Sequence, residues 1–366
     1  MEIKKRDFLA ISIGATVGLA ATSAIAQQAA PAAAAQGQAA RVPPSVNSGV
    51  QPLSVDMNYK PRRLNKAIEL WEDGQPVYYT SAGLGFGVDS YAQGVKMART
   101  WADAIDIGME HTAVDLPGVR DFMRGLADGG PTRSGHRIPA VFVEFVLVNY
   151  SKAQAEANQW LVGQLLDCGV HGVHFCHSRD PEAVQVCAQL SMRYPFNYPG
   201  VPKLPIQGLR GSSASGAAQV WGVNINRYNH VADLWPLNPR GEIMCGVHIE
   251  DTYAVANAEK TLAVPGVTFA EWGPGDLSYW LYGLSIMPED GARIPDVNQR
   301  PEMLAVRRKV LDLCKKNKIM FLNAANTDPN NGNYIITQIK DGAMLFEAPE
   351  AAAIIGREYT KRKMPV

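Results

Sequence analysis

Short apolar runs alternate with amphipathic segments along most of the chain. The clearest apolar run is PAVFVEFVLV at residues 139–148, which is nearly continuous, as a buried parallel strand requires. Other runs rich in β-branched and aromatic residues predict strands at residues 75–82, 104–111, 172–177, 319–325 and 343–346. Helical periodicity predicts helices at residues 90–101, 116–126, 151–166, 181–192, 303–316 and 349–359, and one near Ile335.

The segment at residues 244–281 combines this alternation with acidic residues. Two short apolar runs each lead to an acid beside a turn, Glu250 after VHI and Asp276 within WGPGDL. An amphipathic helical segment at about residues 254–264 lies between them. Such a unit makes successive strands parallel, so both carboxylates are expected at the same end of a sheet. Carboxylates gathered there, with open positions left over, suit Mg²⁺ or Mn²⁺.

Eight strand–helix alternations favour an α/β fold, a (β/α)8 TIM barrel. A doubly wound open sheet is the alternative, but the glycine-rich run at residues 83–87 lacks the register of a dinucleotide-binding turn. Residues 194–240 are rich in Pro, Gly and aromatic residues and predict an inserted loop region before the fifth strand. We assign residues 54–366 to one barrel, because roughly 310 residues suit it better than two domains.

The first residues have the pattern of an export signal rather than of a fold. Residues 1–26 combine a basic start, a short apolar run and the small-x-small sequence Ala24-Ile25-Ala26. Lys5-Arg6 approaches the twin-arginine pattern, and an ordinary secretory signal is the alternative. The run is too short and too interrupted to favour a membrane anchor. Residues 27–53 predict a flexible low-complexity linker, and we expect a periplasmic or secreted protein without membrane association after signal removal.

Charge and cysteine content narrow the class of protein. The formal net charge is zero with Lys and Arg scattered, so no basic stripe indicates a nucleic-acid partner. The five cysteines form no CxxC pair and have apolar neighbours, so we expect mostly small buried residues, at least one free thiol and no disulfide scaffold.

Four segments resemble the HpcH/HpaI (2,4-dihydroxyhept-2-ene-1,7-dioate) aldolase family of the phosphoenolpyruvate/pyruvate barrel superfamily. The resemblance covers most of the chain from Ile68 to Lys361, and the third and fourth segments together are its most specific part. The segments are residues 106–111 (DIGMEH); 166–172 running on to Ser178 and 193–195; 248–250 with 256–257; and 265–267 with 273–278.

The resemblance implies a divalent metal held by Glu250 and Asp276, either Mg²⁺ or Mn²⁺, with Co²⁺ as a further option. Such a metal chelates an α-keto acid and stabilises its enolate while a carbon–carbon bond forms or breaks. General chemistry agrees, because aldol cleavage leaves negative charge on oxygen and a cation there lowers the barrier. The alternative is that both acids are structural, one beside a helix N-cap and the other bonded to its own Pro-Gly turn.

Two histidines are candidate catalytic groups. His111 matches the family's base-carrying histidine, and imidazole suits that task because its pKa lies near neutrality; the alternative is a structural histidine at a strand end. The family's aspartate three residues earlier is Gly108 here. The family's glutamine before the metal glutamate is His248 here, which could be a third ligand, a second base or a polar filler.

The substrate-binding pattern departs further from the family. The family's arginine at the end of the third strand is missing from residues 138–152, and Glu144 lies near its place. A carboxylate there repels an anionic keto acid, so the usual pyruvate substrate does not follow. Arg210 matches an Arg-Gly of the family and is a candidate substrate ligand, or else an exposed charge on a glycine-rich loop. The backbone around Gly275 is expected to meet the substrate oxygen.

Aromatic residues and further histidines leave alternatives open. Aromatic walls near the site suit a flat substrate, whereas the same residues could pack the insertion onto the barrel or form a subunit contact. Of the histidines around the fourth strand, we place His177 at the barrel mouth and leave His171 and His174 structural. The aromatic residues in question are Phe196, Tyr198, Trp221, Tyr228 and Trp235, with Trp280 and Tyr282 after Asp276.

Together these features predict an exported, metal-dependent carbon–carbon lyase of the class II aldolase type acting on a small molecule. One alternative is a lyase that releases a small aldehyde such as formaldehyde from an aromatic substrate. Another is a non-catalytic periplasmic barrel that binds a small acid. The resemblance also implies a homo-oligomer, either a trimer or a hexamer.

Overall fold

The computed structural model describes residues 55–145, 149–212, 214–289, 296–324 and 332–366. In these residues eight parallel strands close into a barrel in chain order, because β8 pairs with β1. The predicted (β/α)8 TIM barrel is confirmed, and residues 1–54, with the predicted signal and linker, lie outside the described part. The strands are β1 (Val77–Ser81), β2 (Ala104–Gly108), β3 (Ala140–Phe145), β4 (Gly172–Phe175), β5 (Met244–His248), β6 (Phe269–Glu271), β7 (Met320–Asn323) and β8 (Ala343–Glu347).

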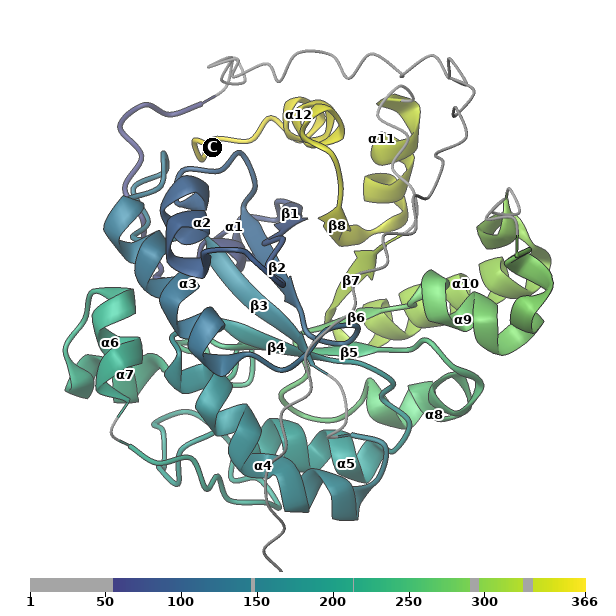
Figure 1. Ribbon diagram of the computed structural model, residues 1–366, viewed down its shortest axis with the longest axis horizontal. Helices are drawn as coiled ribbons and strands as arrows, with labels where there is room; N and C mark the ends of the chain where they lie inside the picture. Colours follow the sequence, from purple (N-terminus) through teal and green to yellow (C-terminus); the bar gives the residue numbers. More distant parts are fainter. Residues whose placement is uncertain (1–54, 146–148, 213, 290–295, 325–331) are drawn as a thin grey trace, which may run out of the picture. The chain divides into compact units, whose positions relative to one another are not determined.

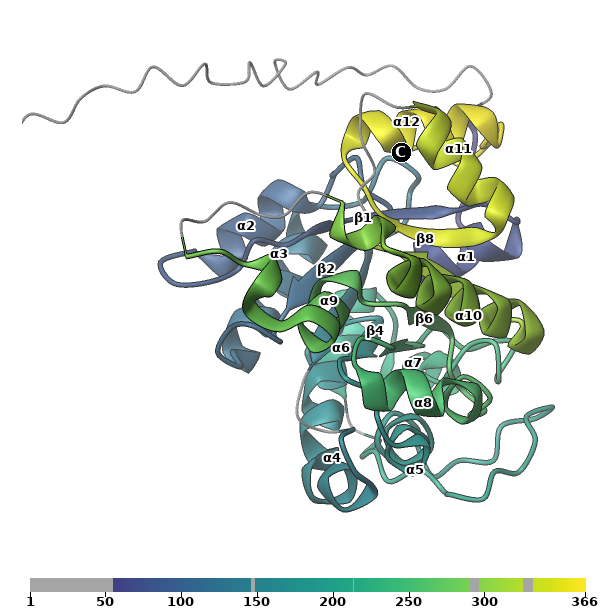
Figure 2. The same ribbon diagram turned by 90° about the vertical axis from the view of Figure 1, so that its right-hand side faces the viewer.

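Helices surround these strands (Figure 1), and α8, α9 and α10 pack against one another outside the barrel (Figure 2). Their starts follow from the sequence; Asp115, for example, caps α3 by accepting from the Gly118 amide at 2.9 Å. The helices are α1 (Lys66–Glu72), α2 (Ser90–Met97), α3 (Leu116–Gly129), α4 (Lys152–Asp167), α5 (Pro181–Gln185) continued by a π-helical turn (Val186–Ser191), α6 (Ser215–Trp221), α7 (Ile225–Val231), α8 (Thr252–Thr261), α9 (Pro274–Tyr282), α10 (Pro301–Asn317), α11 (Gly332–Asp341) and α12 (Glu350–Tyr359), with short 3₁₀ turns at Gly283–Ile286 and Val297–Gln299.

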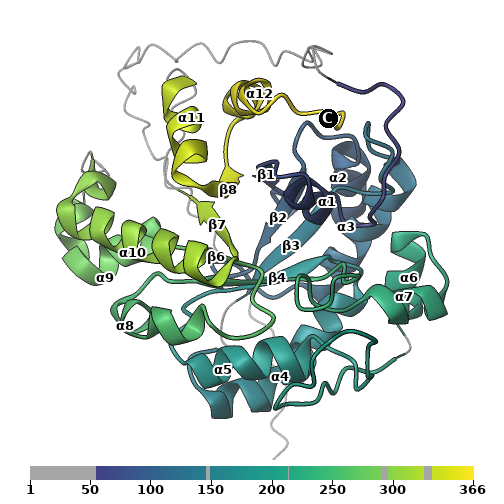
Figure 3. The same cartoon turned by 180° about the vertical axis from the view of Figure 1, so that it is seen from behind.

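Three elements differ from the expectation. The second strand ends at Gly108, three residues before the predicted end at His111. The expected Pro-Gly turn around Asp276 is instead the first turn of α9, which Pro274 begins. The predicted loop insertion contains two helices, α6 and α7, and α6 packs against α3 and α4 on the outside of the barrel (Figure 3).

The N-terminal end of the barrel is apolar and closed by α1. Residues facing inward along the strands, such as Tyr79, Phe142 and Phe269, form one buried cluster with Ile68 and Trp71 of α1. The α1 helix was not predicted, although Asn65 caps it by accepting from the amides of the first turn. This plug makes the lower half of the barrel a packed core rather than a channel.

The inward-facing positions change character toward the C-terminal ends of the strands. Since side chains alternate along a strand, the next inward positions after the apolar layer are polar. They are Asp106 on β2, Glu144 on β3, His174 on β4, His248 on β5, Glu271 on β6 and Glu347 on β8. Gly246 permits this layer, because a Cβ there would lie 2.2 Å from the Phe269 ring and 2.7 Å from that of His174.

Two further expectations concern the chain as a whole. All five cysteines are buried and free, which confirms that they form no disulfide scaffold. Among the described residues, no helix has both the length and the apolar character needed to span a membrane.

Candidate active site and metal centre

The acidic layer and the loops above it form two adjoining groups at the C-terminal mouth of the barrel. The first, which we call the outer group, consists of Glu110, His177, Glu250 and Asp276. The second, the inner group, consists of Glu144, His174, His248 and Glu271. Within each group the potential ligand atoms lie within 4.8 Å of one another. This is the end of the barrel at which TIM-barrel active sites form.

Glu250 and Asp276 meet because two backbone features bring their elements together. Asp276 lies in the first turn of α9, where the helix dipole favours a negative charge. Gly273 precedes this helix with φ +47°, and a Cβ there would lie 2.2 Å from the Cβ of Glu250. Only glycine therefore permits the start of α9 to lie against Glu250. The predicted meeting of the two carboxylates at one end of the sheet is observed.

His177 lies at the centre of the outer group. Its backbone has φ +49°, a strained conformation for a residue other than glycine. In this conformation its amide donates to Glu250 Oε1 at 2.6 Å, and its Nδ1 lies 2.9 Å from Asp251 Oδ2. Its Nε2 lies 3.4 Å from both Glu110 Oε1 and Asp276 Oδ2. The placement of His177 at the mouth agrees with the sequence interpretation.

Asp251 holds His177 from behind. This carboxylate is fully buried and also caps α8, accepting from the amides of Tyr253 and Ala254 at 2.9 Å each. It further accepts from Arg179 Nε at 2.7 Å. A buried carboxylate bonded to one ring nitrogen fixes the orientation of the imidazole and directs the other nitrogen toward the site.

The carboxylates at the mouth stabilise the protonated imidazoles of His177 and His248. Burial alone would lower the pKa of His177, but its bonds to Asp251 and Asp276 outweigh this and raise the pKa to about 10. Burial also opposes the charge of His248, yet Glu250 and Glu271 raise its pKa well above the ordinary value. The bond from His177 in turn holds the pKa of Asp276 below its usual range.

Other acids at the mouth lack compensating charge. Burial, only partly offset by nearby His248, raises the pKa of Glu144 to about 8. Burial and then the Glu144 charge raise the pKa of Asp106 well above its ordinary value. Burial and then Glu250 raise the pKa of Glu110. These acids retain protons because ionising them together in the buried mouth is unfavourable, and a bound cation would replace such protons.

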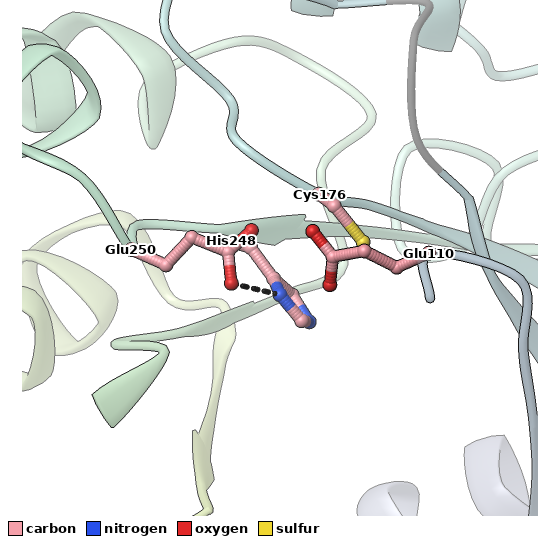
Figure 4. Close-up of side chains that lie close together, drawn as sticks. All are labelled: Glu110, Cys176, His248 and Glu250. Atoms are coloured by element: carbon pink, nitrogen blue, oxygen red, sulfur yellow. Dashed lines mark hydrogen bonds and ion pairs between the residues drawn. The ribbon is translucent and has the colours of Figure 1, made fainter. Parts of the chain in front are cut away.

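The two groups are joined through His248 and Glu250. The Nδ1 of His248 lies 2.8 Å from Glu250 Oε2. Figure 4 shows the carboxylates of Glu250 and Glu110 reaching toward each other from opposite sides, with the His248 ring beside them and the sulfur of Cys176 next to Glu110. These four residues also have potential ligand atoms within 4.8 Å of one another.

The remaining predicted site residues lie in different surroundings. His111 is exposed on the rim, with Nε2 3.5 Å from Glu110 Oε2. Gly275 lies beside Asp276 in the first turn of α9, with open space where a Cβ would be. Arg210 is buried rather than exposed, and its Nη2 donates to Tyr228 at 2.7 Å and Asp167 at 3.1 Å. Because α4 runs back from the mouth and ends at Asp167, Arg210 lies toward the opposite end of the barrel.

The aromatic residues separate in the same way. Trp221 stacks on His171 at 4.9 Å and Trp235 on Trp71 at 5.9 Å, so these insertion residues pack onto the barrel. At the mouth, three rings instead surround the guanidinium of Arg179, with centroids 4.6 Å (Tyr150), 4.8 Å (Trp280) and 5.4 Å (Tyr253) away. Of this aromatic rim, only Trp280 was a candidate from the sequence.

Sequence reasoning missed several groups at the site, namely Glu110, Cys176, Asp251 and Glu271. Glu110 and Glu271 had a readable signal, since each is an acid at or just after a predicted strand end. Asp251 follows Glu250 directly and precedes a helix, which is the position of an N-cap.

Comparison of the chain with protein-family models and with curated proteins gives no match. Solved structures with the same fold include the HpcH/HpaI aldolase from Desulfitobacterium hafniense DCB-2, at 20% identity over 80% of this chain and 93% of that one, with a TM-score of 0.53. An HpcH/HpaI aldolase/citrate lyase family protein from Burkholderia cenocepacia J2315 is 18% identical over 80% and 96%, with a TM-score of 0.54. The citrate synthase SbnG is 18% identical over 81% and 95%, with a TM-score of 0.53. The fold is therefore the one that the family resemblance implied.

Proposed function

We propose that this protein is a metal-dependent carbon–carbon lyase of the class II aldolase type that works at the outer group. The observation that carries the proposal is the meeting of three carboxylates, Glu110, Glu250 and Asp276, around His177 at the barrel mouth. The likeness of the fold to HpcH/HpaI aldolases supports the same reaction class.

The outer group has the composition of a divalent metal site. Glu250 and Asp276 would hold the cation, with Glu110 within reach, and hard oxygen donors suit Mg²⁺ or Mn²⁺, with Co²⁺ as an option. Glu110 Oε1 is buried and has no hydrogen-bond partner, so this oxygen is available as a ligand atom. The bound cation would supply positive charge next to the keto oxygen on which negative charge develops.

His177 is the group best placed to move the proton. In aldol cleavage a base takes the proton of the substrate hydroxyl while the carbon–carbon bond breaks. The electron pair of that bond passes to the keto fragment, the aldehyde leaves, and the proton returns to the carbon of the keto fragment. The carboxylates keep His177 protonated in the metal-free protein, and a cation on Glu250 and Asp276 would lower its pKa toward the range of a base. We assign this proton to His177 Nε2, because Asp251 fixes the ring through Nδ1. His111 and His248 are the rival bases, and glutamine variants of all three histidines separate them.

The aromatic rim favours a substrate with a flat ring and an acidic group. The side chain of Arg179 is 24% exposed, so a cation is present at the mouth although the third strand carries no arginine. Trp280 and Tyr253 are 43% and 59% exposed, so their rings are available to a ligand. This supports an aromatic substrate that releases a small aldehyde over the usual pyruvate aldol.

The test combines metal content with aldehyde release. Wild type should hold metal at the outer group and release aldehyde in a chelator-sensitive way across a panel of keto-acid aldols and aromatic alcohols. The double variant Glu250→Ala, Asp276→Ala should lose both properties. The matched control is Glu259→Ala, Asp312→Ala, which removes two exposed acids from α8 and α10. Unchanged metal and turnover in the first double variant would contradict the proposal, and metal binding without any turnover would indicate the non-catalytic barrel.

Export through residues 1–26 and assembly into a trimer or hexamer are also proposed. Fractionation of cells that make the full chain, and light scattering on the purified mature protein, test them. Protein confined to the cytoplasm, or a monomer at working concentration, would contradict the respective proposal.

A further inference from the structure

We propose that the inner group is a second metal site, distinct from the outer group and selective for a first-row transition metal. Glu144, His174, His248 and Glu271 come from four adjacent strands, β3 to β6, and face the inside of the barrel. The proposal concerns binding and does not depend on the lyase reaction.

The contacts around His248 Nε2 carry the argument. This atom lies 2.8 Å from His174 Nδ1 and 2.9 Å from Glu271 Oε2, and 3.8 Å from Glu144 Oε1. A ring nitrogen has either one hydrogen or one lone pair, so it forms one good hydrogen bond and not two or three. Three potential ligand atoms thus converge on one ring nitrogen, whose single hydrogen serves only one of them well, whereas a shared cation would serve all of them.

The spacing agrees with coordination. Two ligand atoms that are each about 2.1 Å from one ion lie roughly 3.0–3.4 Å apart at right or tetrahedral angles. The separations of 2.8 and 2.9 Å at His248 Nε2 are within a few tenths of an ångström of this range. Glu144 completes the set by a small movement of its side chain.

A second observation is a buried polar atom of this group without a hydrogen-bond partner. The side chain of His174 is fully buried, and its Nε2 forms no hydrogen bond and lies 3.9 Å from Glu271 Oε2. Buried polar atoms are nearly always satisfied in folded proteins, so an unpaired imidazole nitrogen beside Glu271 supports a ligand site here. Glu144, whose side chain is 20% exposed, leaves an entry path from the mouth.

The donor set predicts which cation binds. Two imidazoles with two carboxylates suit Mn²⁺, Fe²⁺, Co²⁺ or Zn²⁺, whereas Mg²⁺ prefers oxygen ligands and water. The outer group, with three carboxylates, suits Mg²⁺ better. His248 links the sites, since its Nε2 faces the inner group and its Nδ1 lies 2.8 Å from the outer ligand Glu250. This is the carboxylate–histidine–metal arrangement that fixes the ligating tautomer.

Co²⁺ titration of the chelator-treated full-length mature protein tests the proposal, with metal counting and the visible Co²⁺ absorption spectrum as readouts. We expect two equivalents for wild type and one for His174→Gln and for Glu271→Gln. Asp276→Asn should also keep one, with the imidazole-ligated Co²⁺ spectrum. Excess Mg²⁺ should displace Co²⁺ from the outer group only.

His171→Gln is the matched control, because His171 is equally buried but stacks on Trp221 outside both groups. It should keep two equivalents. A single equivalent that His174→Gln and Glu271→Gln retain and Asp276→Asn loses would overturn the inner site. A single equivalent with the reverse pattern would support it and contradict the outer site instead. Circular dichroism identifies a variant that fails to fold. In that case the number of Co²⁺ equivalents bound by wild type decides, since two equivalents support the inner site.

Discussion

The two ends of this barrel treat buried charge in opposite ways. Near the N-terminal end, Asp103 is fully buried among three cations, with Arg362 at 2.6 Å, Lys66 at 3.2 Å and Arg357 at 3.3 Å. At the C-terminal mouth, carboxylates face one another and outnumber the histidines between them. The first end uses charge to fix the chain terminus and α12 against the barrel. The second gathers acids that are unfavourable to ionise together until a cation or substrate arrives, as functional sites commonly do.

The pKa directions express the same contrast. Burial would raise the pKa of Asp103, but Arg357 and Arg362 hold it well below the usual range. For Asp106, three residues further along, burial and Glu144 raise the pKa well above it. Replacing Asp103 should therefore cost stability, whereas replacing an acid of the mouth whose pKa is raised, such as Glu144, should cost little or none.

The largest effect is expected for Asp103→Asn. Removing this charge leaves Lys66, Arg357 and Arg362 buried together without their anion, and breaking a buried pair in this way costs about 3–5 kcal/mol. Urea unfolding measures the loss. The exposed Asp128→Asn on α3 is the control, with an expected change below about 0.5 kcal/mol. A similarly small change for Asp103→Asn would break the contrast between the two ends.

Asp251→Asn should have the next largest effect, and mainly on turnover. Asparagine can still cap α8, but it no longer balances a charged His177, so we expect turnover to fall roughly 100- to 1,000-fold. The pKa of His177, raised to about 10 in wild type, should fall in an NMR titration.

The accompanying stability loss has a definite sign with pH. A histidine whose pKa is raised on folding stabilises the protein fully below about 6.5, and this stabilisation is lost as the pH rises through about 10. The Asp251→Asn loss should therefore shrink over that window. Asp115→Asn, at the cap of α3, is the control that leaves turnover and the His177 titration unchanged.

Glu144→Gln tests whether an acid of the mouth makes the stability of the folded protein depend on pH. The pKa of Glu144 is raised from 4.5 to about 8, so metal-free wild type binds more protons than the unfolded chain in this window. Its stability should fall from pH 4.5 to pH 8, and the glutamine variant should show a smaller fall. Urea unfolding of the chelator-treated protein across this range checks it, with the exposed Glu156→Gln as control. If wild type and Glu144→Gln lost the same stability between pH 4.5 and pH 8, the pKa of Glu144 would not be raised in the folded protein.

The sequence was sufficient to predict the barrel fold and the shared position of the carboxylates of Glu250 and Asp276, because both follow from local periodicity. Glu250 and Asp276 each follow an apolar run, and parallel strands place such positions at one end. The exact strand end was not readable, and it matters: with β2 ending at Gly108, Glu110 enters the outer group and His111 lies exposed.

The partner of His177 could not be predicted either. Asp251 lies 74 residues further along, and the contact depends on the pairing of β4 with β5 and on the left-handed backbone of His177. Neither feature can be predicted from the local amino-acid composition. Arg210 illustrates the converse, since a short motif match suggested substrate binding while the fold placed the side chain between Tyr228 and Asp167.

Trp280→Ala should have the smallest effect, confined to substrate binding. Trp280 is 43% exposed and its ring lies 4.8 Å from the Arg179 guanidinium, so its loss should leave stability within about 0.5 kcal/mol. An aromatic substrate should show a KM raised roughly 2- to 13-fold, since a stacking contact contributes about 0.5–1.5 kcal/mol. Trp160→Ala on α4, also exposed at 56%, should leave KM unchanged. Equal KM values for both variants would show that the aromatic rim does not contact the substrate. The rings at the mouth would then only pack against Arg179, as Trp221 packs against His171.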